Sequence, residues 1–252
     1  MKVTTKITSI AFLIGLAACG GGGDDSGNKE VTICPRVING ETCEESGSPI
    51  VELNIITNKG KTSLCSGTVV SPTKVLTAAH CFLSVSVNSV IVNAGGTFHD
   101  AVAYSIHPNV AVSSNSIIND VAIVQTETTI NAPTLPILIG TTPQVGDMIG
   151  INGYGLDESD NLGVLRGGKM KITNVTTNHV IAAYTGELSN TCNGDSGGPA
   201  TYTKNGKVAV IGITSSGIKT DCSAGDETLF TNIQSQSVLD YLADVAPEIS
   251  VL

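Results

Sequence analysis

The sequence predicts an all-β protein, and three observations lead to that fold class. Short runs rich in Val, Ile and Thr recur from Val51 onward, separated by Gly, Asn, Asp, Ser or Pro, as is typical of a β-sandwich or barrel. Only Ser237 to Val245 has helical spacing, and Pro247 follows it. No internal repeat and no alternation of strands with helices is visible in the chain.

Seven runs show the strand pattern most clearly. They are Val75 to Thr77, Val90 to Asn93, Ala101 to Ile106, Val121 to Gln125, Met148 to Asn152, Lys169 to Val175 and Val208 to Thr214. In the helical stretch, one face carries Val238, Leu239, Leu242 and Val245.

Composition excludes several classes of protein. A chain of 252 residues is long enough to bury a sizeable core. Its 28 glycines show no Gly-x-y period, which excludes collagen. Lys and Arg number 13 against 22 Asp and Glu, a net charge of −9. Proteins that neutralise phosphates carry the opposite balance, so we expect no nucleic-acid partner.

The N-terminus reads as an export signal. Lys2 and Lys6 precede an apolar run that is too short to span a bilayer as a helix. The run ends in Leu-Ala-Ala-Cys-Gly around Cys19, which resembles the lipobox of bacterial lipoproteins, and a Gly-rich stretch typical of a flexible tether follows. The resemblance implies cleavage before Cys19 and its lipidation. An ordinary signal peptide is the alternative.

These features predict a division of the chain and a location. Residues 1–18 are a lipoprotein signal peptide, 19–36 a flexible tether and activation segment, and 37–252 the folded domain. The protein is then exported and lipid-anchored to a bacterial membrane, at the outer membrane or cell surface. Seven cysteines are present, and lipidation of Cys19 leaves six. Six cysteines on an exported chain favour three disulfides over a metal site, and no spacing resembles paired metal-ligand clusters. We expect no metal and no cofactor.

Three short strings suggest catalytic chemistry. They are Thr-Ala-Ala-His-Cys ending at Cys81, Asn-Asp-Val-Ala-Ile-Val starting at Asn119, and Asn-Gly-Asp-Ser-Gly-Gly-Pro starting at Asn193. A serine hydroxyl becomes a nucleophile when an imidazole removes its proton, and a carboxylate holds that imidazole in the required tautomer. Glycines beside the serine let the backbone turn tightly and direct its N–H groups at an oxyanion.

Together the strings resemble the trypsin/chymotrypsin-like serine proteases over Val37 to Val245. The resemblance implies two six-stranded antiparallel β-barrels with a C-terminal helix. It makes His80 the general base, Asp120 the carboxylate that orients it and Ser196 the nucleophile. The backbone N–H groups of Gly194 and Ser196 then form the oxyanion hole.

Flanking residues extend the resemblance. It implies a disulfide between Cys65 and Cys81 beside the histidine, and a second between Cys192 and Cys222 that frames the specificity pocket. Ser215 matches the serine that hydrogen-bonds the catalytic aspartate. Gly153-Tyr154-Gly155 matches the family's Gly-Trp-Gly, and His107 lies in a structural turn. His99 and His179 match nothing and are expected at the surface.

The predicted pocket comprises Asn190, Thr191, Ser215, Gly217 and Thr228. Asn190 stands where trypsins carry an aspartate, and an amide offers no ion pair to Lys or Arg. Thr228 narrows the back of the pocket, and Thr214 replaces the histidine of glutamate-specific members. We therefore expect an uncharged, small to medium P1 side chain, that is, the residue on the acyl side of the cleaved bond. One alternative stays open: Asp226 or Glu227 reaches the pocket if the loop shifts by a residue or two.

The resemblance also implies a zymogen. Cleavage after Arg36 frees the amino group of Val37, which then pairs with the buried Asp195. With the other pairs assigned, Cys34 and Cys43 remain, nine positions apart. A disulfide between them encloses the cleaved bond.

The predicted function is that of a serine endopeptidase acting on proteins or peptides, with an activating protease as a further partner and a monomeric state. The main alternative is a catalytically silent lipoprotein of the same fold that serves as a binding or adhesion module; it predicts loss of a key residue, and none is lost. A structural lipoprotein, and a quality-control protease with an added peptide-binding domain, are weaker alternatives.

Overall fold

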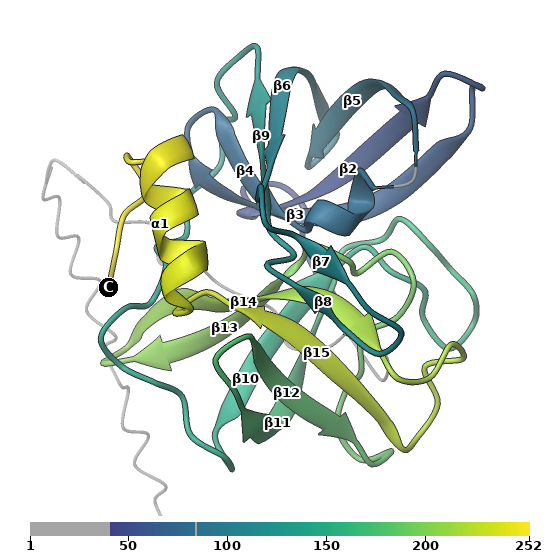
Figure 1. Cartoon of the computed structure of the whole chain (residues 1–252). Coiled ribbons are helices and arrows are strands. Elements are labelled where there is room, and N and C mark those ends of the chain that lie inside the picture. The colour runs from purple at the N-terminus through teal and green to yellow at the C-terminus, as the bar shows by residue number, and fades with distance from the viewer. Residues whose placement is uncertain (1–40, 84) are drawn as a thin grey trace, which may run out of the picture. The chain divides into compact units, whose positions relative to one another are not determined.

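The strands of the protein form two closed antiparallel barrels, as Figure 1 shows for a computed structural model that describes residues 41–83 and 85–252. The predicted activation site and Cys19 lie outside the described residues. This architecture confirms the predicted fold class. Among the described residues, no helix is long and apolar enough to cross a membrane.

The first barrel joins six strands in the order β2-β3-β4-β9-β6-β5. Their bounds are β2 Ile50–Thr57, β3 Thr62–Ser71, β4 Lys74–Thr77, β5 Val87–Ala94, β6 Thr97–Ile106 and β9 Ala122–Thr126. Strand β2 shows how the sequence separates the inner from the outer face of this barrel. Leu53 and Ile55, two positions apart, are fully buried, whereas the residues between and after them are partly exposed.

The second barrel follows the order β11-β10-β13-β14-β15-β12, and pairing of β11 with β12 closes it. The short strand β1, Glu41–Thr42, adds to the edge of β11. The other bounds are β10 Met148–Gly153, β11 Arg166–Val175, β12 His179–Tyr184, β13 Pro199–Lys204, β14 Lys207–Gly217 and β15 Asp226–Asn232. All seven runs predicted as strands lie in or overlap these twelve barrel strands.

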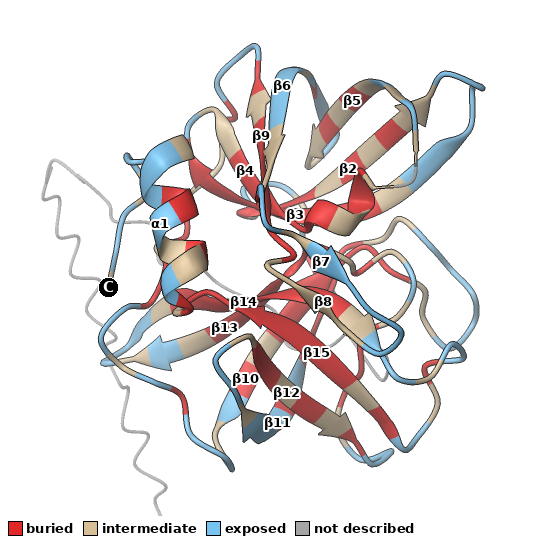
Figure 2. Ribbon diagram, viewed as in Figure 1, coloured by how far each residue is buried: buried red, intermediate tan, exposed pale blue. Residues whose placement is uncertain are grey.

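Smaller elements complete the fold. Strands β7 Ala111–Val112 and β8 Ile117–Ile118 form a two-stranded sheet, and a 3₁₀ turn, η1, spans Ala79–Cys81. Helix α1, Gln236–Val245, starts one residue before the predicted helix. Its apolar face packs on the hydrophobic core cluster to which the buried residues of the first barrel belong. A second core cluster fills the other barrel, and buried residues line the strands of both (Figure 2).

Loops from both barrels carry the predicted catalytic residues His80 and Ser196. Turn η1 follows β4 of the first barrel, and the Asn193–Gly198 loop leads into β13 of the second. The backbone N–H of Ser66, in β3, donates to the carbonyl of Ser196 at 2.7 Å. This bond joins the two barrels directly at the predicted nucleophile.

Candidate active site

His80 and Asp120 form the best-defined contact of the site. His80 Nδ1 lies 2.7 Å from Asp120 Oδ2, and the backbone N–H of His80 donates to Oδ1 at 2.8 Å. Because an ionised carboxylate only accepts hydrogen bonds, the contact places the ring proton on Nδ1. Nε2 of the neutral ring is then available to accept a proton.

The Asp120 carboxylate is completely buried and fixed from several directions. Ser215 Oγ donates to Oδ2 at 2.5 Å, and Thr231 Oγ1 donates to the Asp120 carbonyl at 3.1 Å. Asn119, the preceding residue, has φ 54°, a left-handed conformation that Asn tolerates better than most residues. The turn thus directs the next side chain inward toward His80, whose own side chain is 24% exposed.

The loop that carries Ser196 depends on two left-handed glycines, Gly194 with φ 102° and Gly197 with φ 83°. A Cβ atom on Gly197 would lie 2.0 Å from Thr77 Oγ1, so no other residue fits there. Ser66 Oγ donates to the Gly194 carbonyl at 2.8 Å. Among the described residues, the N–H groups of Gly194 and Ser196 donate to no protein acceptor, and both are available to an oxyanion.

His80 and Ser196 line one cavity of about 240 Å³. In the described part of the chain, no hydrogen bond joins Ser196 Oγ to His80, which is common for such pairs without substrate. Polar atoms dominate the cavity wall. The other lining residues are Thr191, Cys192, Asn193, Thr214, Ser215, Ser216, Gly217, Lys219, Cys222 and Asp226.

A chain of buried hydrogen bonds lies behind this wall. Thr191 Oγ1 and Thr228 Oγ1 are 2.8 Å apart, and Thr228 donates to Asn190 Oδ1 at 3.1 Å. Asn190 Nδ2 donates to Asp226 Oδ2 at 2.8 Å and to the Cys222 carbonyl at 3.1 Å. Asn190 and Thr228 are fully buried and do not line the cavity, whereas Asp226 does.

Comparison with known proteins identifies the family. The family model described as Trypsin matches residues 37–240. The chain belongs to the trypsin family. It is 31% identical over 193 residues to brachyurin of Leptuca pugilator, covering 67% of this chain and 82% of that protein. It is 27% identical over 223 residues to alkaline trypsin C of Manduca sexta, covering 76% and 82%.

A solved structure titled HL collagenase shows the same fold. It superposes with a TM-score of 0.69 at 18% sequence identity, covering 82% of this chain and 97% of that one. The family model and the relatives support a serine endopeptidase acting on protein or peptide substrates.

Two predicted disulfides of this trypsin-family domain are confirmed. Cys65 pairs with Cys81, and Cys192 pairs with Cys222. Cys34 lies outside the described residues, so its pairing with the buried Cys43 stays a prediction. Within the described residues, one cluster has the spacing of metal ligands, namely Cys65, His80 and Cys81. Both of its cysteines are in a disulfide, which leaves no thiolate for a metal.

The environment of Asp195 explains the glycines of the Gly153-Tyr154-Gly155 segment. The backbone N–H groups of Gly155 and Cys192 donate to its carboxylate at 2.9 and 2.8 Å. A Cβ atom on Gly153 or Gly155 would lie within 2.5 Å of that carboxylate. Burial raises the pKa of Asp195 to about 7, against the opposing effect of the two N–H donors and of Arg166.

Two expectations about histidines were wrong. His99 and His179 are buried rather than exposed, because each side chain has a specific partner: His99 Nδ1 lies 2.8 Å from Thr128 Oγ1, and His179 Nε2 lies 2.9 Å from the Ile117 carbonyl.

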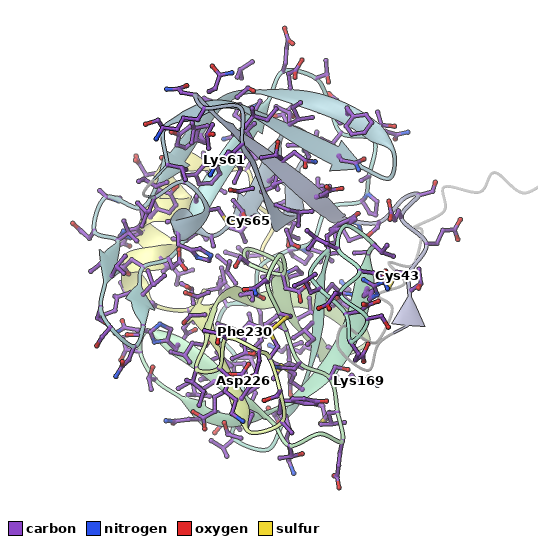
Figure 3. The ribbon with its side chains drawn as sticks, turned by 90° about the vertical axis from the view of Figure 1, so that its right-hand side faces the viewer. Cys43, Lys61, Cys65, Lys169, Asp226 and Phe230 are labelled. Carbon is purple, nitrogen blue, oxygen red and sulfur yellow. A yellow bond between two sulfur atoms is a disulfide. The ribbon has the colours of Figure 1, made fainter. Side chains whose placement is uncertain are left out.

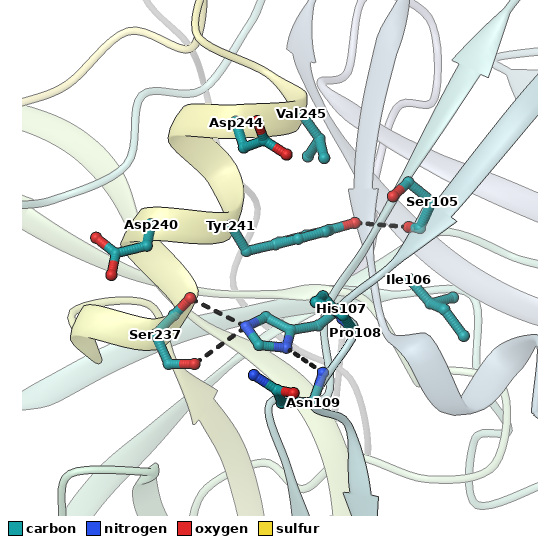
Figure 4. Close-up of a pocket in the computed structure, with 10 residues that line it drawn as sticks. All are labelled: Ser105, Ile106, His107, Pro108, Asn109, Ser237, Asp240, Tyr241, Asp244 and Val245. Atoms are coloured by element: carbon teal, nitrogen blue, oxygen red, sulfur yellow. Dashed lines mark hydrogen bonds between the residues drawn. The ribbon is translucent and has the colours of Figure 1, made fainter.

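His107 is buried in a structural turn, as predicted. Its ring bridges the start of α1 and the chain that follows β6 (Figure 4). Nε2 lies 3.0 Å from the Ser237 carbonyl, and Nδ1 accepts from the Asn109 N–H at 3.1 Å.

Asp226 is a buried acidic residue of the cavity that the predicted pocket did not include. It lies at the first position of β15, and Phe230 of the same strand packs in the core of the second barrel (Figure 3). The signal available in the sequence was the acidic pair Asp226-Glu227, which entered only as an alternative. Glu227 is not among the residues that line the cavity.

Proposed function

We propose that the protein is a serine endopeptidase in which Ser196, His80 and Asp120 act as a catalytic triad through an acyl-enzyme. The observation that carries the proposal is the fixed His80–Asp120 pair on the same cavity as Ser196. Ser215 supports it by holding the carboxylate that orients the imidazole.

In this mechanism the imidazole takes the Ser196 proton as the hydroxyl attacks the scissile carbonyl. The buried Asp120 stabilises the imidazolium that forms, and His80 then donates the proton to the leaving amine. The N–H groups of Gly194 and Ser196 stabilise the tetrahedral oxyanion. After the amine leaves, a water molecule takes its place. His80 accepts a proton from this water as it attacks the acyl-enzyme, and the proton then returns to Ser196 as the acid product is released.

The proposal includes synthesis as a zymogen that an activating protease cuts after Arg36. Support comes from Asp195, a buried carboxylate that has no cation within 4 Å among the described residues. Burying an unpaired charge is costly, and the new amino group of Val37 supplies the missing cation.

The proposal also includes export as a monomer and a lipid on Cys19 that anchors the protein to a bacterial membrane, at the outer membrane or cell surface. Support for the anchor is the lipobox resemblance of the sequence around Cys19. An uncharged, small to medium P1 residue is the preference that Asn190 predicts. That preference depends on Asp226 taking no part in substrate recognition.

Active-site labelling tests the proposed chemistry. A fluorophosphonate should label Ser196 of protein processed at Arg36, and mass spectrometry should place the adduct on that residue. Ser196→Ala and His80→Ala should each lower peptide hydrolysis by several orders of magnitude, in line with known triads. Ser216→Ala, which removes another hydroxyl from the same cavity, should keep the label.

Full hydrolysis by pure Ser196→Ala protein would favour a mechanism without this triad. A correctly folded, processed protein that neither reacts nor hydrolyses any peptide would support the silent binding module.

A further inference from the structure

The cavity that holds Ser196 also contains a buried carboxylate. Asp226 is 1% exposed and lines the same space as His80 and Ser196. No Lys, Arg or His nitrogen within the described residues lies within 4 Å of it. Lys219 is nearby in sequence, but its ammonium donates instead to the Ala224 carbonyl at 2.5 Å and to Ser223 Oγ at 3.4 Å. Within the part of the chain that the structure describes, the carboxylate therefore has no cationic partner of its own.

The two oxygens of this carboxylate accept different numbers of hydrogen bonds, all from neutral donors. Oδ1 accepts from the backbone N–H groups of Ile218, Lys219 and Glu227 at 2.8 to 2.9 Å. Oδ2 accepts from Asn190 Nδ2 at 2.8 Å. A carboxylate oxygen offers about two lone-pair sites. Oδ1 is therefore saturated, and Oδ2 keeps one site for a further donor.

Two hydroxyl groups on the cavity wall also have unused capacity to accept hydrogen bonds. Thr228 uses its only proton on Asn190 Oδ1, so Thr191 must donate to Thr228 in their shared bond. The lone pairs of Thr191 Oγ1 are then available, and Thr191 lines the cavity. Thr214 is 5% exposed, and its Oγ1 is buried without a hydrogen-bond partner among the described residues. A buried hydroxyl without a partner costs free energy, which a ligand can recover.

We infer that Asp226, with Thr191 and Thr214, forms a P1 site for an ammonium group, so that the enzyme cleaves after lysine. This rests on the proposed function and replaces its uncharged P1 preference. An ammonium is a compact charge with three donors, which matches one carboxylate oxygen and two hydroxyls. A guanidinium binds a carboxylate best through two parallel bonds, and the saturated Oδ1 excludes that arrangement. Lysine is therefore favoured over arginine.

Two neighbouring residues make the site possible. Gly217 leaves the path to the carboxylate open, because a Cβ atom there would lie 3.0 Å from Asp226 Oδ2. Asn190 acts as a positioning residue. Its amide donates to the carboxylate from behind the wall, and its own oxygen is occupied by Thr228. Asn190, which predicted an uncharged P1 residue, thus holds in place the carboxylate of Asp226, which β15 contributes.

A series of peptide substrates that differ only at P1 tests the inference on processed wild-type enzyme, with its concentration fixed by fluorophosphonate titration. We expect kcat/KM for P1 Lys to exceed that for Gln, Leu and Ala by about tenfold or more, and that for Arg by a smaller factor. Preference for an uncharged P1 residue would overturn the inference and restore the prediction from Asn190. Preference for Arg over Lys would overturn the assignment of an ammonium site. In both cases the labelled Ser196 would leave the proposed function intact.

Variants show whether Asp226 itself is responsible. Asp226→Asn should lower kcat/KM for P1 Lys by about tenfold to hundredfold while changing that for P1 Leu much less. The exchange Asn190→Asp with Asp226→Asn keeps one carboxylate and one amide in the pair and should restore part of the Lys preference. Asp221→Asn removes an exposed carboxylate from the segment that precedes β15 and serves as the control for long-range charge. An equal loss for Lys in Asp221→Asn would mean that general charge, and not Asp226, selects the substrate.

Thr214→Val separates recognition from structure. In the protein without substrate, the buried Thr214 hydroxyl has no hydrogen-bond partner among the described residues and so costs free energy. The free energy of unfolding of Thr214→Val should therefore be unchanged or higher. If Thr214 also binds the ammonium, the ratio of kcat/KM for Lys to that for Leu should fall by about threefold to tenfold. An unchanged ratio would remove Thr214 from the site. If Asp226→Asn does not fold, the P1 series on the wild-type enzyme still decides the inference.

Discussion

Deprotonation of Asp195 should destabilise the unprocessed protein. Its carboxyl pKa is about 7 in the folded chain, because burial disfavours the charge, against 3.8 as the ordinary value. The folded state therefore binds the proton more tightly than the unfolded state. Stability should be highest at low pH, fall as the pH rises from about 4 to about 7, and stay level above that. A difference of about three pKa units corresponds to about 4 kcal/mol in all.

Urea unfolding of two matched proteins measures this effect. Both carry Arg36→Gln and Ser196→Ala to prevent processing and self-cleavage, and one also carries Asp195→Asn. The amide that Asp195→Asn introduces can accept only one of the two backbone hydrogen bonds, because its NH2 group is a donor. This loss is the same at every pH, and the amide does not titrate. Between pH 5 and pH 8 the free energy of unfolding of the protein that keeps Asp195 should fall by about 2.5 kcal/mol relative to that of the protein with the amide.

Processing at Arg36 should abolish this dependence. A Val37 ammonium paired with Asp195 favours the charged carboxylate and lowers its pKa, so stability no longer falls over this range of pH. A difference between the two unprocessed proteins that is constant from pH 5 to pH 8 would refute the argument about burial. The same fall in processed protein would refute the pairing with Val37.

Three further predictions concern other parts of the molecule. Ser215→Ala removes the hydroxyl bond to the triad carboxylate and should lower kcat/KM about tenfold without changing the P1 preference, as steady-state kinetics would show. Gly197→Ala should cost about 3 kcal/mol in urea unfolding through steric overlap and backbone strain, whereas Gly206→Ala, with a similar φ of 76° and open space around it, should cost about 1. If Cys34 pairs with Cys43, processed protein should stay on membranes until a reductant is added, and release without reductant would contradict the pairing.

The residues of the predicted triad could be found from the sequence because each lies in a short string whose neighbours have local roles. Gly197 is required by a positive φ and by the closeness of Thr77, and the cysteine at position 81 pairs beside His80. Such requirements act over a few residues and leave a recognisable pattern. Seven of the twelve barrel strands could likewise be predicted, because each contains a run rich in Val, Ile and Thr, residues that pack well on a sheet.

The specificity pocket could not be found in the same way. Its walls come from the loop before Ser196, from β14 and from β15, and β14 pairs with β15 through an irregular register between Thr214 and Ser216. A shift of one position there decides whether Asp226 or a neighbour reaches the cavity. Nothing in the local sequence determines that register.

The sequence by itself determined the all-β class through its strand pattern. Through the resemblance of its short motifs to a known family, it also determined the two barrels, two disulfides and the identity of the residues around Ser196. Only the tertiary structure decided that His99 and His179 are buried, that Asn190 lies behind the cavity wall and that Asp226 faces the cavity. Each of these depends on which groups from distant segments meet, as when His179 contacts the carbonyl of Ile117. A side chain's burial and the charge it presents depend on those partners, and the chain specifies them only once both barrels have closed.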